Sequence, residues 1–385
     1  MKAIPTTERK IMNIESEDKK FNAEFDRSYS EKNPDFKAHV NIALVGKVSS
    51  GKSSLLNAIL KCERENPIAP VGAKSGVTTE VTPYKLDEKV LIVDCPGLDD
   101  VRKENSAVTK DFIDNIDLGL FVVTGSADAS QKSNFDDLKN STEHVLVVLN
   151  HIDAWDDLDE SAYEEVEQQW KSVLGVDKVF GCCTKGYDPK MKKSAPMDIR
   201  GVNELRDQIF RFLKENKKDI LFARHLRDKS SYATGIISAA LVAVAAEAFI
   251  PGSAAYITAT QVVAITSLNY LYTGEALNKT SVLSLLPTFA GQSAGTTLFL
   301  WAKSFLPPTG VVDIAAAGIA VVVTFAMLAA VKWMLENNHS LDDKVTLKET
   351  FNRFKKIGEA LKDISLEDIK SKQKLISLLG RLLSQ

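Results

Sequence analysis

The sequence predicts an α/β domain, built on a doubly wound and mainly parallel sheet, followed by an all-α hydrophobic helical domain. Three observations carry this prediction. Short apolar, β-branched runs recur through the first half of the chain, as buried parallel strands require. A glycine-rich loop at residues 46–53 lies between a strand-like run and a helix-like run. Residues 233–330 contain only five charged side chains, whereas 26% of the whole chain is charged.

Two domains are the natural expectation for 385 residues, because a single hydrophobic core rarely serves so long a chain. We expect a charged helical segment over 1–37, the α/β domain over 38–218, a basic helix with the hydrophobic domain over 219–340, and amphipathic helices over 341–385. The strands are expected to begin near the following residues, the second of them as an antiparallel edge: Val40, Glu80, Val90, Leu118, His144 and Lys178.

Composition argues against several classes of protein. The formal net charge is −3, which gives no global sign of nucleic-acid binding. The four cysteines show no C-x-x-C spacing, and with only five histidines the chain predicts neither a zinc site nor a disulfide framework. The N-terminus lacks an apolar signal segment, so the expected location is the cytoplasm.

The glycine-rich loop reads G-x-x-x-x-G-K-S, the phosphate-binding loop of nucleoside-triphosphate proteins. Its glycines let backbone amides point at phosphate oxygens, and the helix that follows favours negative charge at its start. Lys52 is expected to neutralise charge on the β- and γ-phosphates, and Ser53 to bind Mg²⁺. The predicted nucleotide contacts in and beside the loop are Gly46, Lys47, Val48, Ser49, Ser50, Gly51, Lys52, Ser53 and Ser54.

The base is expected to be read where a later strand ends. The apolar run 144–149 is followed by Asn150-His151-Ile152-Asp153, an N-x-x-D pattern close to the N-K-x-D guanine motif. Asp153 can accept hydrogen bonds from the ring N–H and the exocyclic amino group of guanine, a donor pair that adenine lacks. Asn150 is expected to bind the ring edge and to tie this loop to the phosphate loop. His151 takes the place of the usual Lys.

Another strand-like run ends in Asp94-Cys95-Pro96-Gly97, which resembles the D-x-P-G motif of guanine-nucleotide proteins. There Asp94 would hold Mg²⁺ through water, and the Gly97 amide would sense the γ-phosphate. The stretch 76–81 would supply the switch threonine.

Either Thr78 or Thr79 is the expected Mg²⁺ ligand within that stretch, with Thr78 favoured; the other would be a threonine of β-strand propensity. Thr184 and Lys185 lie in a stretch that resembles a divergent S-A-K loop, which would place Lys185 over the base.

In this order and spacing the motifs resemble those of an Era-like or dynamin-like GTPase, over about residues 38–218. The resemblance implies GTP as the ligand, Mg²⁺ as the cofactor and hydrolysis of GTP to GDP and phosphate. It also implies catalytic roles for Ser49, Lys52 and Thr78. The implied metal ligands are Ser53, Asp94 and Thr78 or Thr79.

The catalytic residues depart from the Ras-like pattern at Leu98. Leu98 occupies the position of the Gln that orients water in Ras-like proteins, and its side chain can neither donate nor accept a hydrogen bond. Ser49 resembles the dynamin-type serine that helps bind a monovalent cation, although the dynamin Gln before it is Val48. Lys47 is either a charge donor in cis or trans or a solvated lysine.

We therefore expect slow hydrolysis, stimulated when two such domains form a homodimer face to face. A nucleotide-regulated scaffold that scarcely hydrolyses GTP is the alternative.

The charge-poor segment has two interpretations. Residues 314–331 form an uncharged run of 18, the lower limit for spanning a bilayer, and residues 234–250 are similar but interrupted by Glu247. The alternative is an all-helical domain buried on all sides, or a helical hairpin that docks onto membranes. The spacing Gly291-x-x-x-Gly295 suits close helix packing in either setting.

The flanking segments extend these interpretations. Residues 211–229 carry a local net charge of +4. This charge is expected either to bind the anionic membrane lipids of a bilayer surface or to belong to a solvated linker helix. The order of GTPase, basic helix and hydrophobic helices resembles a family of bacterial Era-like GTPases with a hydrophobic C-terminal domain. More distantly it resembles immunity-related GTPases, whose helical domain receives segments from both chain ends. We expect peripheral membrane association, with an integral membrane protein as the alternative.

The two ends of the chain differ in pattern. Residues 1–37 are either an amphipathic helix ending before Asn33-Pro34 or disordered. Spacings of three and four in the C-terminal stretch predict two amphipathic helices that pack on the helical domain or form an oligomer contact. The residues with these spacings are Phe351, Phe354, Ile357, Leu361, Leu366, Ile369, Leu375, Leu378, Leu379, Leu382 and Leu383.

Overall fold

The computed structural model describes residues 6–71, 81–103, 107–188, 190–250, 252–290, 314–361 and 372–383. The chain divides into two compact units. One is an α/β unit, Asp35–Asp228, and the other is a helical unit that combines Met1–Pro34 with Lys229–Gln385. The N-terminal segment therefore belongs with the helices that follow the α/β unit rather than with the α/β unit itself.

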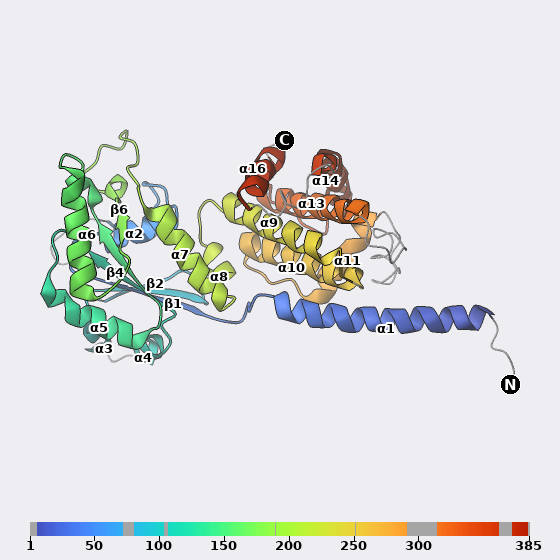
Figure 1. Ribbon diagram of the computed structural model, residues 1–385, viewed down its shortest axis with the longest axis horizontal. Coiled ribbons are helices and arrows are strands. Elements are labelled where there is room, and N and C mark those ends of the chain that lie inside the picture. The colour runs from blue at the N-terminus through green and yellow to red at the C-terminus, as the bar shows by residue number, and fades with distance from the viewer. Residues whose placement is uncertain are drawn as a thin grey trace. The chain divides into compact units, whose positions relative to one another are not determined.

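Six strands form the sheet of the α/β unit, in the spatial order β2-β3-β1-β4-β5-β6 (Figure 1). They are β1 (Val40–Val45), β2 (Thr82–Lys85), β3 (Val90–Cys95), β4 (Leu118–Val123), β5 (Val145–Asn150) and β6 (Phe180–Cys182). Strand β2 pairs with β3 in the antiparallel sense, and the other described pairs are parallel. The predicted doubly wound, mainly parallel sheet is confirmed.

Helices cover both faces of this sheet, as Figure 1 shows. They are α2 (Lys52–Ile59), α3 (Leu98–Lys103), α4 (Ala107–Asp114), α5 (Lys132–Ser141), α6 (Glu160–Leu174), α7 (Val202–Glu215) and α8 (Asp219–Ala223), with short 3-10 turns η1 (Ala129–Gln131), η2 (Ile152–Trp155) and η3 (Lys185–Tyr187). Strand β4 is buried along its whole length, which is why its sequence is an unbroken apolar run. The core on one face includes Phe121, Phe135 and Trp170, all at most 1% exposed.

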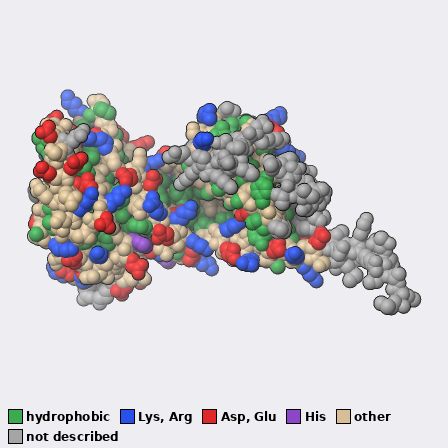
Figure 2. Space-filling view, viewed as in Figure 1, with side chains coloured by type: hydrophobic (Ala, Val, Ile, Leu, Met, Phe, Trp, Pro, Cys, Tyr) green, Lys and Arg blue, Asp and Glu red, His purple; other side chains and the backbone are tan. Residues whose placement is uncertain are grey.

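The basic stretch 211–229 begins in α7 and ends after α8. Leu221 and Phe222 of α8 are buried, so this segment packs on the α/β unit instead of standing free as a linker helix. Two of its cations are paired within the unit: Lys218 Nζ lies 2.6 Å from Asp117, and Arg224 lies 3.3 Å from Asp87. On the visible face of the molecule, Lys and Arg side chains lie interspersed with Asp and Glu (Figure 2). These pairs reduce the charge that the stretch can offer to an anionic lipid surface.

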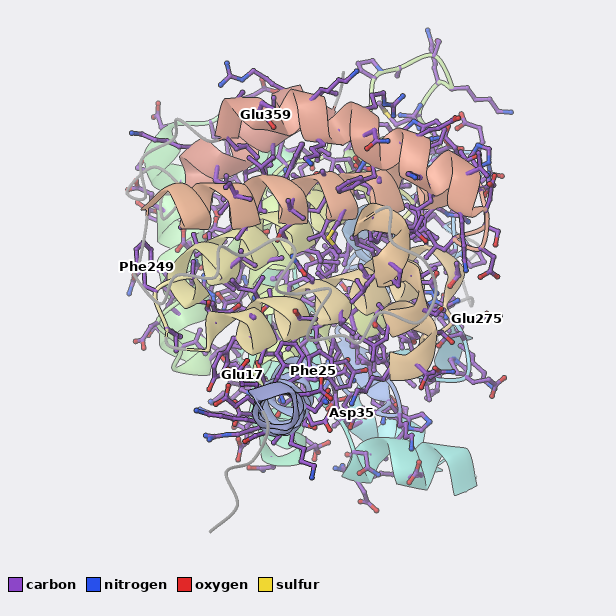
Figure 3. All side chains as sticks on the ribbon, turned by 90° about the vertical axis from the view of Figure 1, so that its right-hand side faces the viewer. Glu17, Phe25, Asp35, Phe249, Glu275 and Glu359 are labelled. Carbon is purple, nitrogen blue, oxygen red and sulfur yellow. The ribbon has the colours of Figure 1, made fainter. Side chains whose placement is uncertain are left out.

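The helical unit is built around apolar helices. Its described elements are α1 (Thr6–Lys32), α9 (Ser230–Glu247), α10 (Ser253–Thr273), α11 (Lys279–Ala290), α13 (Ile314–Glu336), α14 (Lys344–Gly358), η4 (Glu359–Leu361) and α16 (Lys372–Leu383). Helix α13 packs against α9, α10 and α14, and α1 packs along α10. Figure 3 shows α1 end-on, with Phe25 on the side that faces the other helices, where it is 1% exposed.

The C-terminal helices bury one face each, as their spacing predicts. Phe351 and Phe354 of α14 are buried, and the Phe354 ring lies edge-on to Phe325 of α13. Helix α16 buries Leu375, Leu379 and Leu382, and it packs against α9. Leu366 and Ile369 lie outside the described residues, as do Gly291 and Gly295.

Two helices in the described part of the chain are long and apolar enough to cross a membrane, judged by length and composition alone. They are Ser230–Glu247, of which 44% is buried inside the protein, and Ala317–Glu336, of which 83% is buried. A long apolar helix that is mostly buried among other helices also occurs in the core of proteins that do not cross a membrane. Length and apolarity are therefore weak support for a spanning role.

Glu247, the charge that interrupts the first apolar run, is paired inside the helical unit. Its Oε1 lies 2.5 Å from Lys32 Nζ, and Thr260 Oγ1 donates to the same carboxylate at 2.9 Å. Lys32 Nζ also donates to Thr260 Oγ1 at 2.8 Å. Because these residues come from α1, α9 and α10, the polar cluster ties the N-terminal helix to two helices that are distant in sequence.

Removal of Lys32 is expected to destabilise the protein. In a Lys32→Met variant the Glu247 carboxylate, whose side chain is 10% exposed, would lose its only cationic partner in the described cluster. We expect the free energy of unfolding to fall by about 2 kcal/mol, below the full cost of breaking a buried pair because Lys32 is about a third exposed. Urea denaturation followed by circular dichroism measures this change.

The matched control for this prediction is Lys20→Met, on an exposed position of the same helix. The control should leave the unfolding midpoint unchanged. Adding Glu247→Gln to Lys32→Met should recover part of the loss, since the unpaired charge would then be absent. Equal losses in Lys20→Met and Lys32→Met would contradict the assigned role of the ion pair.

Candidate functional site

The predicted motifs converge on one edge of the sheet. Strands β1, β3, β5 and β6 run parallel, so the loops at their carboxyl ends lie at the same edge. The phosphate loop follows β1, the D-x-P-G segment begins at the end of β3, and N-x-x-D begins with the last residue of β5. The stretch with Thr184 and Lys185 follows β6. This edge is where open α/β sheets bind their ligands.

The two glycines of the phosphate loop are required by close backbone approach. A Cβ added at Gly46 would lie 2.2 Å from the carbonyl oxygen of Val122, and one at Gly51 would lie 2.2 Å from Nδ2 of Asn150. Gly51 also has φ of +81°, in the left-handed region that favours glycine. Ser49 has φ of +66° without being glycine, a strained conformation of the kind that gathers at functional sites.

Lys52 lies at the centre of this loop and is 3% exposed. Its ammonium donates to the carbonyl oxygens of Gly46 at 2.7 Å and Lys47 at 3.0 Å, and lies 3.5 Å from Oδ1 of Asp94. Burial lowers the pKa of Lys52, while the carboxylate of Asp94 acts in the opposite direction. The loop thus holds a desolvated cation where a phosphate group would replace the backbone carbonyls as its partner.

Ser53 and Asp94 form a pair suited to Mg²⁺. Ser53 Oγ donates to Asp94 Oδ2 at 3.2 Å, and Asp94 is fully buried. Burial raises the pKa of Asp94, and Oδ1 of its carboxylate has no hydrogen-bond partner in the part of the chain that the structure describes. A hydroxyl beside a buried carboxylate offers the oxygen ligands that Mg²⁺ takes from protein when phosphates and water supply the rest.

Within the described residues, no group of three or more His, Cys, Asp or Glu side chains is placed to hold a metal by itself. The predicted threonine ligands Thr78 and Thr79 lie outside the described residues, so their place in the site stays a prediction.

The segment after β3 brings a glycine and a leucine to the site. An added Cβ at Gly97 would lie 3.2 Å from Oδ1 of Asn134 in α5, so this helix lies close behind the predicted γ-phosphate sensor. Leu98 begins α3 and is 1% exposed, packed in the hydrophobic core. Its side chain is therefore committed to packing, in addition to lacking a polar atom.

Asn150 joins the phosphate loop to the loop after β6. It is fully buried; its Nδ2 donates to the carbonyl oxygen of Ser50 at 3.0 Å, and its Oδ1 accepts from Thr184 Oγ1 at 3.1 Å. Its neighbour His151 has φ of +64°, and its Nε2 would lie 2.8 Å from a Cβ at Gly51. The imidazole therefore packs against the phosphate loop, and burial lowers the pKa of His151.

Asp153 lies among donors that a guanine base would replace. Lys185 Nζ is 3.2 Å from its Oδ2, and the Sγ of Cys183 is 3.6 Å from its Oδ1. The Asp153 side chain is 18% exposed, whereas that of Lys185 is 46% exposed. Hydrogen bonding to Asp153 raises the pKa of Lys185.

Comparison with known proteins agrees with this geometry. Residues 41–174 match the model of a protein family described as "50S ribosome-binding GTPase". The matched range begins in β1 and contains the phosphate loop, D-x-P-G and N-x-x-D. This part of the chain is similar to the Era-like GTPases.

Curated proteins similar to this domain include GTPase Der of Nautilia profundicola, which is 28% identical over 196 residues, 46% of this chain and 36% of the relative. GTPase Era of Caldanaerobacter subterraneus is 30% identical over 203 residues, 50% of this chain and 65% of the relative. The chain thus spans about a third of the Der relative and under two thirds of the Era relative.

A solved structure of Aquifex aeolicus Era bound to GDP and aluminium fluoride is also similar. It is 18% identical, with 54% of this chain and 68% of that chain covered, at a TM-score of 0.33. A likeness at that level adds nothing to the sequence match.

Several side chains that support the candidate site from outside the motifs were not predicted from the sequence. Asp128, in the loop after β4, caps η1 through Ser130 N and forms an ion pair with Lys47 of the phosphate loop. Hydrogen bonding to Lys47 lowers the pKa of Asp128 to about 2. The pattern D-x-S before a turn is a capping signal that would have placed Asp128, but nothing in the sequence links it to Lys47. Arg64, Asn57 and Tyr187, which connect α2 to other parts of the α/β unit, were also not predicted from the sequence.

Proposed function

We propose that this protein is a Mg²⁺-dependent GTP-binding protein that hydrolyses GTP to GDP and phosphate. One observation carries the proposal: at one sheet edge the buried Lys52 and the Ser53–Asp94 pair lie across Asn150 from the carboxylate of Asp153. The first group fits a triphosphate with Mg²⁺ and the second fits guanine. When bound, Mg²⁺ would neutralise charge on the phosphates.

Leu98 stands where a water-orienting side chain would be expected, so we infer that a group from outside the domain completes the catalytic site. Because Leu98 is buried and apolar, it does not position a nucleophilic water. The outer part of the phosphate loop, in contrast, is exposed at Lys47, Val48 and Ser49, and Val48 is 46% exposed. We propose that a second copy of the domain completes the site across this exposed face and thereby raises the rate of hydrolysis.

Burial of Leu98 also favours the second candidate, a GTP-binding switch or scaffold with negligible hydrolysis. Release of phosphate in a single turnover separates the two candidates, because a scaffold would retain intact GTP over the lifetime of the complex. A dimer-stimulated enzyme would instead release phosphate at a rate that rises with protein concentration.

For the helical unit we propose a membrane-associating role controlled by the nucleotide. The support is the charge-poor composition, together with Ile250, which follows the end of α9 and is 44% exposed. The pairing of Glu247 with Lys32, and the burial of α13, favour peripheral association over spanning. Extraction by carbonate, as opposed to detergent alone, distinguishes peripheral from integral attachment.

One experiment tests the proposal as a whole: co-sedimentation of the full chain with liposomes of neutral and of anionic composition, with GTP, with GDP and without nucleotide. Phosphate release is read from the same tubes over a range of protein concentrations. We expect sedimentation to depend on the nucleotide, and turnover per molecule to rise with protein concentration. A flat turnover profile, with and without liposomes, would refute dimer stimulation, and equal sedimentation in all three nucleotide states would refute nucleotide control.

A further inference from the structure

We call residues 184–187 the base-reading stretch, because Lys185 is predicted to lie over the base. The guanidinium of Arg64 binds backbone carbonyls of this stretch and of the chain that follows it. Its Nε donates to the carbonyl oxygen of Gly186 at 2.7 Å. Its Nη1 donates to the carbonyl oxygens of Lys192 at 2.9 Å and Lys193 at 3.1 Å, and Nη2 reaches that of Pro196 at 3.4 Å. The planar guanidinium of Arg64, from just beyond α2, thus donates hydrogen bonds to several backbone carbonyls and holds them close together.

Tyr187 makes a second attachment between the same two parts of the chain. It is 5% exposed, and its hydroxyl lies against the carbonyl oxygens of Cys62 and, at 3.2 Å, Asn57. Burial raises the pKa of Tyr187 to about 12, so the hydroxyl remains a donor at every physiological pH. Asn57 lies in the last turn of α2, where helix carbonyls lack partners within the helix, and Cys62 lies just beyond that end.

The C-terminal end of α2 is itself fixed. The amide of Cys62 donates to the carbonyl oxygen of Asn57 at 2.9 Å, and Lys61 adopts a positive φ of +55°, which closes the helix. The side chain of Asn57 is fully buried and binds the backbone of Ile68 and Ala69. The attachment points for Arg64 and Tyr187 are therefore parts of a rigid junction at one end of the phosphate-loop helix.

The stretch from Thr184 to Tyr187 is consequently held at both ends. Thr184 is fastened to Asn150, and through Asn150 to the phosphate loop, while Gly186 and Tyr187 are fastened to the end of α2. Lys185, the residue predicted to lie over the base, sits between these anchors. The helix whose first turn forms the phosphate site thus carries the base-reading stretch at its other end.

We propose that Arg64 and Tyr187 are positioning residues for base recognition: they set the place of the stretch after β6 and so determine guanine affinity, although neither is among the predicted nucleotide contacts. The inference rests on the proposed guanine-nucleotide site. Ordering of Lys185 before the nucleotide arrives reduces the entropy lost on binding, and most of such an effect falls on the dissociation rate.

A purely structural role makes a different prediction, and Arg206 in α7 provides the comparison. Arg206 also caps α2, donating to the carbonyl oxygens of Ala58 at 2.7 Å and Ile59 at 2.8 Å, but its described bonds do not reach the stretch after β6. It is 8% exposed, so its loss would weaken the same helix end at least as much as the loss of Arg64.

The test measures dissociation of methylanthraniloyl-GDP from the full chain by stopped flow, together with KM and kcat for GTP and the urea midpoint. In Arg64→Met we expect dissociation to accelerate roughly 10-fold, and in Tyr187→Phe roughly 3-fold to 5-fold, from the loss of several bonds and of one bond respectively. KM should rise in parallel while kcat at saturating GTP stays the same. Arg64→Lys, which keeps the charge without the planar fork, should fall between wild type and Arg64→Met.

In the control variant, Arg206→Met or the milder Arg206→Lys, the urea midpoint should drop while the dissociation rate stays at the wild-type value. Unchanged dissociation in a folded Arg64→Met would overturn the inference while leaving the proposed function intact. So would equal acceleration in the Arg64 and Arg206 variants, because that reports only a weakened helix end. Failure of the wild-type protein to bind the labelled GDP would overturn the proposed function and this inference with it.

Discussion

Lys52→Ala is expected to abolish nucleotide binding, with a loss of GTP affinity of roughly 1000-fold or more. The side chain is 3% exposed and its ammonium bonds only to loop carbonyls and Asp94 among the described residues, so it is already desolvated and directed into the phosphate loop. In a buried site a charge–phosphate contact is far stronger than in water. Isothermal titration with GTP and GDP measures the loss.

The control for this variant is Lys85→Ala, at the end of β2 away from the phosphate loop, whose ion pair with Glu88 is exposed. GTP affinity should be unchanged in the control. If Lys52→Ala kept wild-type affinity, the assignment of the phosphate loop would be wrong. A folded apo protein is a condition of the test, and circular dichroism establishes it.

The same substitution should change how stability depends on pH. Without the Lys52 ammonium, Asp94 is buried as an uncompensated carboxyl, and burial already raises its pKa. A raised pKa means that the folded state binds the proton more tightly than the unfolded state does. Stability of the variant should therefore fall as the pH rises from about 4, the ordinary value for Asp, toward the folded pKa. Urea midpoints at pH 5 and pH 7.5 show the slope, which should be steeper than in wild type.

The local motifs of the nucleotide site could be predicted from sequence because each depends on short-range chemistry. Gly51 must be glycine for its positive φ and for the approach of Asn150, and a strand followed by G-x-x-x-x-G-K-S and a helix leaves few alternatives. The strands were likewise readable, since burial on both faces leaves an uninterrupted apolar run such as Leu118–Val123.

Contacts between distant segments could not be predicted in this way. Nothing near Arg64 indicates that its guanidinium will meet the carbonyl oxygens of Gly186 and Pro196, because backbone acceptors carry no sequence signal. Glu247 looked like an isolated charge in an apolar run, and its partner Lys32 lies more than two hundred positions away on α1. A single sequence gives local patterns, whereas these pairings are set by the packing of whole helices.

The second large effect is expected at Asp153. In Asp153→Asn, the carboxylate that we propose accepts from both the ring N–H and the exocyclic amino group of guanine becomes an amide with one acceptor and one donor. The new N–H₂ group would oppose the amino group of guanine, leaving polar groups unpaired in a side chain that is only 18% exposed. GTP affinity should fall roughly 100-fold or more, from two charge-assisted hydrogen bonds lost.

The Asp153→Asn variant is also expected to bind xanthosine triphosphate. Xanthine carries a carbonyl where guanine carries its amino group, so the Asn amide donates to it while its oxygen still accepts from the ring N–H. The variant should therefore prefer the xanthine nucleotide over GTP, reversing the order in wild type. The phosphate half of the site, with Lys52 and Ser53, is unchanged, so bound xanthosine triphosphate should be processed as GTP is in wild type.

Asp156→Asn is the matched control, three positions on in the same loop. Both carboxylate oxygens of Asp156 bind Arg200, at 2.9 Å and 2.6 Å, in a largely exposed pair, and the residue is not among the predicted base contacts. The control should leave the ratio of GTP to xanthosine triphosphate affinity as in wild type, because neither nucleotide contacts that carboxylate. Competition against labelled GDP measures both ratios. If Asp153→Asn and Asp156→Asn shifted the ratio equally, or neither shifted it, Asp153 would not be the group that selects the base, and the guanine assignment would lose its basis.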